Sequence, residues 1–277
     1  MNATATIPAS HRLRRTLAHT GVLTRRNLLA AVRPRDVMII SAIQPIVFML
    51  LFLFVFGGAI EAALPAAADG AYVNWLVPGI LAQFAVFGAS VTALGVHNDR
   101  VTSVVDRFRS LPMARGAALA GRTTADVIRT GAMLLLQTGV GVLLGFRPQA
   151  GVAGLAGALG LALAFSYACG WIMATIGLVV RNSEAIQATV YSVLFPLTLL
   201  SSVFLPTQTM PGWLQAFADH QPVTILANAV RGLVLGPDAL PPGQSVTGQT
   251  LLALGWTVAI LAVMMPIATR TYRRTVS

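Results

Sequence analysis

The sequence predicts an all-α polytopic membrane protein with six transmembrane helices. Of its 277 residues, 56% are hydrophobic and only 10% are charged, whereas soluble globular domains carry about 25% charged residues. The apolar residues also gather in uncharged runs that approach or exceed the roughly 20 residues a helix needs to cross a bilayer. These observations exclude a disordered chain, a disulfide-stapled secreted module and most cytosolic enzymes.

Residues 1–36 form a polar N-terminal segment that is rich in arginine. A signal peptide has a short basic region, an apolar core of about 7–15 residues and a small-residue cleavage site. Here the polar segment precedes a full-length apolar run. We therefore expect it to be a cytoplasmic segment of the protein and not a cleavable signal.

Six uncharged apolar stretches are the predicted spans, and the third is the shortest. They cover residues 37–58, 72–96, 130–146, 151–179, 185–205 and 250–268. A charged side chain costs at least about 2.5–3.5 kcal/mol at the centre of a bilayer, so intramembrane charges usually mark ion paths or proton relays. The absence of charge from the predicted spans argues against a proton-coupled antiporter.

The distribution of arginine predicts the orientation of the chain. Only Arg147 and Arg231 fall on one side of the predicted membrane. The other arginines lie in residues 1–36, 97–129, at 181 and in 269–277. Because cytoplasmic segments are enriched in basic residues, both termini are expected in the cytoplasm, which an even number of spans requires. Arginines placed between apolar runs, without a solvated basic face, argue against nucleic-acid binding.

Residues 206–249, between the fifth and sixth spans, are too long for a simple turn. Four apolar residues follow the i, i+3, i+4, i+7 spacing of one helix face: Met210, Trp213, Leu214 and Phe217. A second helical rhythm follows Pro222. We predict two short helices that lie in the outer membrane surface or dip into it. They must pack on the bundle, because backbone at membrane depth needs internal hydrogen bonds or a cavity.

The sequence lacks the residues of nucleotide binding, metal binding and catalysis. All 19 basic residues are arginine, so the chain cannot supply the P-loop lysine that contacts nucleotide phosphates. The four histidines lack metal-ligand spacing, the single Cys169 has no disulfide partner, and no G-x-S-x-G motif occurs. We predict a non-catalytic subunit without a metal or cofactor; if ATP drives it, another chain binds the ATP.

Neutral polar and aromatic side chains in the predicted spans allow two interpretations. They either make interhelical hydrogen bonds and packing contacts, each hydrogen bond worth about 0.6–2 kcal/mol, or they line the path of an amphiphile. Because these side chains are uncharged, they suit a mainly hydrophobic substrate with only a few polar groups. The candidate pathway residues are Gln44, Phe48, Phe52, Gln83, Phe84, Phe87, Ser201 and Ser202.

Two stretches resemble a known family. The run from Phe195, FPLTLLSSVFLPTQTMPGWLQAFADHQPVTILANAVRGLVLG, resembles the signature of type-2 ABC exporter permeases and is most similar to the actinobacterial daunorubicin-resistance-type branch. Many members have Gly where Ser202 stands. The stretch DRFRSLPMAR from Asp106 resembles the family's cytoplasmic segment before the third span. A Glu common near the start of that segment is missing, and residues 97–99 occupy its place.

The resemblance implies a multi-pass permease of a bacterial plasma membrane, with an amphipathic N-terminal interfacial helix and an external re-entrant hairpin. The N-terminal arginines also fit a simple topology anchor attracted to anionic lipid. A second permease copy or paralogue and two ABC ATPase subunits, which hold ATP and magnesium, would complete the assembly. The residues implied in coupling to an ATPase are Arg107, Phe108, Arg109, Leu111, Pro112 and Arg115. Those of the external hairpin are Met210, Pro211, Trp213, Pro222 and Arg231.

The predicted function is that of a permease subunit in an ATP-driven exporter of a hydrophobic or amphiphilic drug or antibiotic. Export of a lipid or polysaccharide precursor is an alternative within the family, although charge-free spans argue against a long anionic polymer. A passive channel or membrane scaffold is the alternative from another class. A neighbouring ATPase gene would exclude the passive alternative, and an adjacent antibiotic-biosynthesis cluster would favour a drug.

Overall fold

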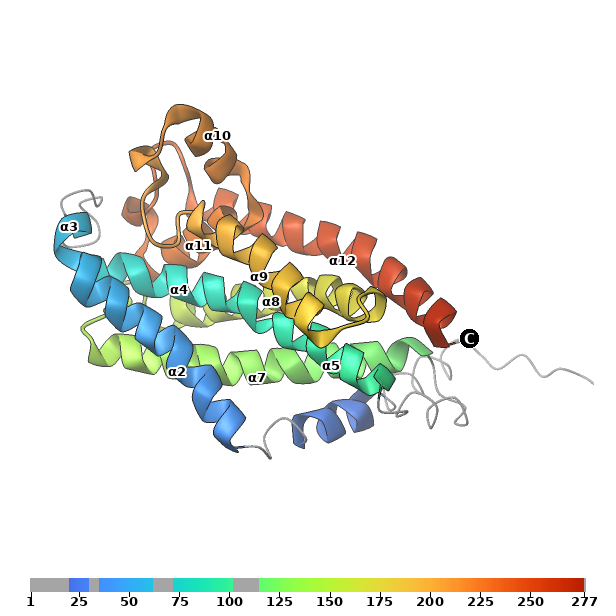
Figure 1. Ribbon diagram of the computed structural model, residues 1–277. Coiled ribbons are helices and arrows are strands. Elements are labelled where there is room, and N and C mark those ends of the chain that lie inside the picture. The colour runs from blue at the N-terminus through green and yellow to red at the C-terminus, as the bar shows by residue number, and fades with distance from the viewer. Residues whose placement is uncertain (1–19, 30–34, 62–71, 102–114, 277) are drawn as a thin grey trace, which may run out of the picture.

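The computed structural model describes residues 20–29, 35–61, 72–101 and 115–276, and within these ranges it contains helices and no strands. The long helices run side by side along one direction, with the C-terminus at one end of the bundle (Figure 1). α3 (Gly57–Glu61) and α10 (Gly212–His220) lie toward the other end. Of the expected coupling residues, Arg107, Phe108, Arg109, Leu111 and Pro112 lie outside the described ranges.

Helix α8 (Gly151–Val179) is the central element of the bundle, and its bounds coincide with those of the fourth predicted span. It packs against α4 (Tyr72–Gly88), α5 (Ser90–Val101), α7 (Arg115–Leu143), α11 (Pro222–Leu235) and α12 (Val246–Val276). Small residues make these contacts close. A Cβ atom at Gly177 of α8 would overlap the backbone carbonyl of Ala93 in α5, so glycine permits the two helices to approach as they do.

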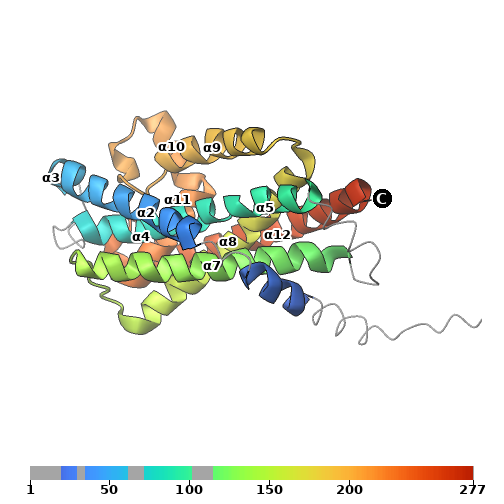
Figure 2. The same ribbon diagram turned by 60° about the horizontal axis from the view of Figure 1, so that its bottom comes forward.

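The first predicted span is a helix on the flank of this core. α2 (Arg35–Leu51) continues through a π-helical turn at Phe52–Phe56 into α3, and it packs on α4 and α7. Residues 20–29 form a further helix. Its Leu23 is buried, and a Cβ atom at Gly121 would lie 2.8 Å from the Leu23 Cβ. This N-terminal helix therefore lies against α7 (Figure 2).

Two short helices form between α9 (Ser183–Leu199) and α12, as the sequence indicates. α11 begins with Pro222, and proline suits the first helical position because its missing N–H needs no partner there. The Val223 backbone N–H donates to Gln221 Oε1 at 3.3 Å and caps the helix. α11 is largely buried against α4, α8 and α12, whereas Trp213 of α10 is 78% exposed.

Helix length and composition identify four candidate membrane spans among the described residues. They are Tyr72–Val101, Leu119–Leu143, Gly151–Val179 and Val246–Arg274. The helices at the first and fifth predicted positions are shorter: the described apolar part of the first is Ala42–Phe56, and α9 has 17 residues. The count of six spans therefore remains a prediction.

The helix that contains the third predicted span, α7, begins well before that span and carries charged residues there. The candidate span on this helix begins at Leu119, ahead of the predicted Thr130, and so includes Arg122, Asp126 and Arg129. The sequence before Thr130 is rich in alanine, which favours a helix. Two of the charges also pair within the helix, since Arg122 Nε lies 3.4 Å from Asp126 Oδ2. A search for uncharged stretches starts the span only at Thr130, because it does not take such a pairing of opposite charges into account.

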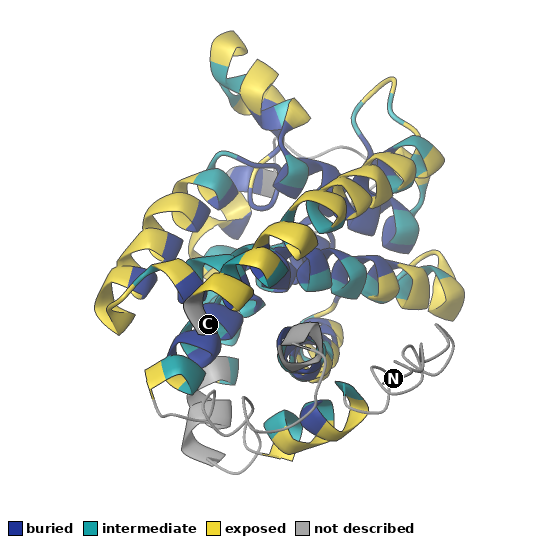
Figure 3. Cartoon of the chain, turned by 90° about the vertical axis from the view of Figure 1, so that its right-hand side faces the viewer, coloured by how far each residue is buried: buried dark blue, intermediate teal, exposed yellow. Residues whose placement is uncertain are grey.

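Large apolar side chains cover much of the outer surface of the bundle. In Figure 3, exposed residues follow the outward faces of the helices while buried residues face inward. Leu251 and Val258 on α12 and Val193 on α9 are among the exposed apolar residues. Soluble monomers rarely expose contiguous apolar surface on this scale. The pattern is that of a membrane protein whose outer face contacts lipid.

Candidate functional site

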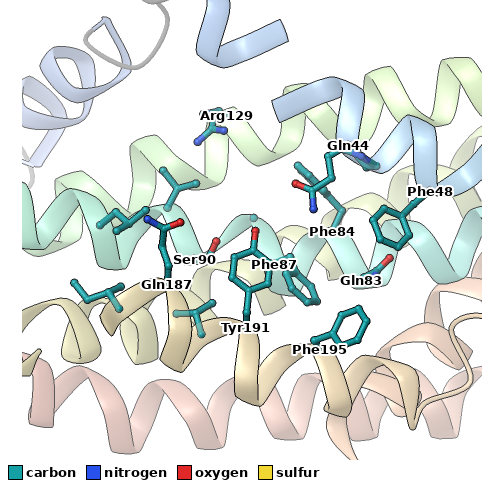
Figure 4. Close-up of a pocket in the computed structure, with 16 residues that line it drawn as sticks. Gln44, Phe48, Gln83, Phe84, Phe87, Ser90, Arg129, Gln187, Tyr191 and Phe195 are labelled. Carbon is teal, nitrogen blue, oxygen red and sulfur yellow. The ribbon is translucent and has the colours of Figure 1, made fainter. Parts of the chain in front are cut away.

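A cavity of about 400 Å³ lies between α2, α4, α5 and α9, with α7 contributing one residue to its wall (Figure 4). It forms beside a loosely packed helix: α9 packs on α4 and α5, and most of its side chains are exposed or half-buried. Pockets for drug-sized ligands measure about 300–1,000 Å³. The cavity thus has the size of a small-molecule site.

Aromatic side chains from three helices form much of the cavity wall. Phe48 comes from α2, Phe84 and Phe87 from α4, and Tyr191 and Phe195 from α9. The rings of Phe87 and Tyr191 face each other with centroids 6.0 Å apart and planes inclined by 48°, within the range of favourable aromatic pairs. These flat apolar surfaces suit a planar, apolar ligand body.

A few polar groups interrupt the aromatic wall. Gln44, Gln83 and Gln187 each offer an amide that can donate and accept hydrogen bonds. Ser90 adds a hydroxyl and Arg129 adds a half-buried guanidinium. Among the described residues that line the cavity, none is acidic. The site therefore combines an apolar body with a small set of mostly neutral polar contacts.

The break between α4 and α5 shapes the cavity at the point where α7 approaches. α4 ends at Gly88 and α5 begins at Ser90, and both residues line the cavity. The Thr92 backbone N–H donates to the carbonyl of Ala89 at 3.0 Å and closes the turn. A Cβ atom at Gly88 would lie 2.9 Å from the Thr130 hydroxyl of α7, so glycine brings α7 close to this wall.

A partly buried charged cluster connects α5 with α7 next to the cavity. Thr92 donates its hydroxyl to Asp126 Oδ2 at 2.8 Å, and Asp126 is only 6% exposed. Arg122 Nη1 donates to Asp99 Oδ2 at 3.2 Å and its Nε lies near Asp126. Arg129, one turn further along α7, is within electrostatic range of Asp126. The charges of these four ionisable residues balance.

Comparison with known proteins identifies the family of this bundle. Residues 18–235 match the family described as ABC-2 type transporter. The chain belongs to this family. A daunorubicin resistance ABC transporter permease protein from Streptomyces coeruleorubidus is 33% identical over 231 residues, which are 83% of this chain and 77% of that protein. A probable doxorubicin resistance ABC transporter permease protein from Mycobacterium tuberculosis (strain CDC 1551 / Oshkosh) is 29% identical over 265 residues, 93% of this chain and 89% of that protein.

The family match confirms the resemblance noted in the sequence. Five of the pathway residues that the sequence predicts for this ABC-2 permease line the cavity. These are Gln44, Phe48, Gln83, Phe84 and Phe87. The first two come from α2 and the other three from α4, so residues of two separate predicted spans converge on one space.

Three expected pathway residues of the permease lie elsewhere and make structural contacts. Phe52 stacks on Phe204 with ring centroids 4.1 Å apart. Ser202 is buried and donates its hydroxyl to Asn228 Oδ1 at 2.7 Å. Ser201 is also buried, and its hydroxyl bonds a backbone carbonyl one turn earlier. These side chains hold the turn after α9 in place.

The pathway candidates named from the sequence include none of the α9 residues that line the cavity. Gln187, Tyr191 and Phe195 all line the cavity and follow one another at i, i+4 spacing, which places them on one helix face. That spacing was the available signal. Arg129 was missed because it lies just before the predicted third span and was counted as a topology residue.

The expected hairpin residues of the permease occupy different environments. Met210 ends the 3-10 turn η3 (Thr207–Thr209), Pro211 precedes α10 and Pro222 opens α11. Arg231, by contrast, is fully buried in α11. Its Nη1 donates to Asn228 Oδ1 and its Nη2 to the Ser202 carbonyl, each at 2.9 Å. The arginine is therefore an internal element of the fold.

Proposed function

We propose that this chain is the permease subunit of an exporter that moves a hydrophobic or amphiphilic drug out across the plasma membrane. A separate ATPase subunit would bind ATP and magnesium and supply the energy. The observation that carries the proposal is the cavity, whose aromatic walls and few polar groups have the composition of a small-molecule site. Relatives named for daunorubicin and doxorubicin resistance support a drug as the cargo.

In this proposal α9 is the moving wall of the cavity. It packs on α4 and α5, whereas α8 is held by five neighbouring helices. A displacement of α9 away from α4 would separate Tyr191 from Phe87 and open the cavity, and the return would close it. A second permease, either a copy or a paralogue, would cover the exposed faces of α2 and α9 and complete the pathway.

The charged cluster is the proposed mechanical link to the ATPase. The chain between α5 and α7 contains the residues expected to dock on the ATPase, and both helices carry cavity residues, Ser90 and Arg129. Arg122 holds the two helices together through Asp99. ATP binding would therefore move α5 and α7 as a pair and change the shape of the cavity. We also propose six spans and cytoplasmic termini, which the distribution of arginine in the sequence supports.

Transport in inverted membrane vesicles tests the proposal. The chain and its co-encoded ATPase are incorporated together, and uptake of daunorubicin is followed by fluorescence with and without ATP. The matched control carries an ATPase whose P-loop lysine is replaced. Uptake that needs ATP and the lysine supports a drug exporter and gives the direction. Assembly and ATP hydrolysis without drug uptake would favour a lipid or polysaccharide precursor, and failure to assemble would contradict the exporter itself.

A further inference from the structure

Glutamine side chains lie on both sides of the aromatic pair in the cavity. Gln83 precedes Phe87 by four residues on α4, and both residues line the cavity. Gln187 precedes Tyr191 by four residues on α9, and these two residues line it as well. α4 and α9 run in opposite directions (Figures 1 and 2). Because the rings of Phe87 and Tyr191 face each other, the two glutamines are displaced from this pair in opposite directions.

The two glutamines are therefore well separated along the cavity. Four residues of helix advance about 6 Å along the axis, so about 12 Å separates Gln83 from Gln187 in this direction. Figure 4 shows the same arrangement, with Gln44 and Gln83 beside Phe48 toward one end of the cavity. Gln187 and Ser90 lie toward the other end. Neutral polar groups thus occupy both ends, and aromatic rings form the wall between them.

The glutamine side chains of the cavity are available to a ligand. Among the described residues, none makes a hydrogen bond to the amide of Gln44, Gln83 or Gln187. Gln83 is half-buried and lies within the candidate span Tyr72–Val101. An amide removed from water is unfavourable unless it is hydrogen-bonded, so a ligand that displaces water from the cavity must supply a partner. Neutral donors and acceptors both satisfy an amide.

We propose that the cavity selects flat, uncharged aromatic molecules that carry a hydrogen-bonding group at each end, and that the polar side chains at its two ends determine this specificity. This inference rests on the proposed function, because it assumes that the cavity binds the transported molecule. The ring body lies against Phe87 and Tyr191, and its end groups bond the amides of Gln83 and Gln187. Arg129, which also lines the cavity, interacts with Asp126.

Two related compounds test the need for two end groups. 2,6-Diaminoanthraquinone and 2-aminoanthraquinone share one flat ring body, are uncharged at neutral pH and differ only in the amino group at the far end. Each is titrated into the full-length purified chain in detergent, and quenching of tryptophan fluorescence gives its dissociation constant. A hydrogen bond typically changes affinity by about three- to tenfold. Wild type should bind the diamino compound more tightly by that factor.

Two variants each remove the polar groups of one end of the cavity. One combines Gln44→Leu with Gln83→Leu, and the other combines Ser90→Ala with Gln187→Leu. With one end apolar, the second amino group finds no partner, so each variant should bring the two dissociation constants within about twofold of each other. The matched control, Gln208→Leu, replaces an exposed glutamine outside the cavity lining and should keep the wild-type preference.

A change in the aromatic wall separates this inference from the proposed function. Tyr191→Ala should weaken the binding of both compounds. If it changes neither, the cavity is not the binding site and both proposals fail. If it weakens both, but wild type binds the two compounds equally or either end variant keeps the preference, only the two-ended specificity is overturned. Should an end variant not fold, equal dissociation constants in wild type overturn it in the same way.

Discussion

The guanidinium carbon of Arg231 lies 3.5 Å from the ring centroid of Trp75, stacked on its face. The same guanidinium donates to the carbonyls of Ser202 and Trp75 and to Asn228 Oδ1. These contacts join α11, the turn after α9 and the first turn of α4. A buried cation is tolerated here because the aromatic face and three acceptors replace much of its hydration shell.

Replacing Arg231 should therefore destabilise the bundle strongly. Arg231→Ala leaves the buried carbonyls of Ser202 and Trp75 without their donor, and each unsatisfied buried polar group costs about 1–3 kcal/mol. We expect a large loss of thermal stability in detergent, measured by fluorescence-detected size-exclusion chromatography after heating. Arg147→Ala is the matched control and should melt like wild type. An unchanged melting temperature in Arg231→Ala would show that the cluster does not hold these segments together.

The pair of Phe87 and Tyr191 should determine drug affinity through its rings. Tyr191→Ala removes one aromatic surface, and an aromatic contact contributes about 0.5–1.5 kcal/mol beyond buried area. Drug binding should weaken by roughly three- to tenfold, as measured by quenching of daunorubicin fluorescence. Tyr191→Phe keeps the ring and should bind like wild type. A loss in the phenylalanine variant equal to that in the alanine variant would assign the role to the hydroxyl instead.

The contact between α5 and α7 should depend on the Asp126 carboxylate. Asp126→Ala removes the acceptor of Thr92 and one partner of Arg122, leaving buried polar groups uncompensated at a cost of about 1–3 kcal/mol. A double-mutant cycle with Thr92→Val measures the coupling from thermal unfolding. We expect the double variant to be less destabilised than the sum of the single variants. Strict additivity would mean that the two side chains do not interact.

Close packing of α8 gives a prediction that needs no functional assay. Gly177→Ala places a methyl group against the Ala93 carbonyl, so α8 and α5 must move apart and stability should fall by about 1–3 kcal/mol. Gly160 lies on the same helix with nothing within 4 Å of an added Cβ. Gly160→Ala should therefore be neutral, or stabilising by about 0.5–1 kcal/mol through helix propensity. Equal melting temperatures of the two variants would contradict the packing described here.

The sequence pattern alone predicts the bounds of those helices that are set by residues nearby in the chain. α8 matches its predicted range because its apolar run is uninterrupted, with Arg147 before it and Arg181 after it. α11 begins at Pro222, where a proline signals a helix start. Both features are legible within a few residues of chain.

Long-range contacts were not predictable in the same way. Arg231 looked like a residue of an external loop, yet its partner Trp75 lies far away in the sequence and only the fold brings them together. Phe52 lies four residues after Phe48, on the same helix face, but its ring stacks on Phe204 and does not line the cavity. From the sequence, Arg129 indicates only membrane orientation. The structure places it on the cavity wall and within electrostatic range of Asp126. A single sequence supplies no information on such pairs.

Protection of a cavity residue by the drug tests the central claim most directly. The chain has one cysteine, Cys169, which is buried. In a Cys169→Ala background, Ser90→Cys places a thiol on the cavity wall, and Ser192→Cys places one on the exposed side of α9. Alkylation by a membrane-permeant maleimide is followed with increasing daunorubicin. Saturable slowing at position 90 and none at position 192 is the predicted result. Equal alkylation rates with and without drug at position 90 would contradict the cavity as the drug-binding site.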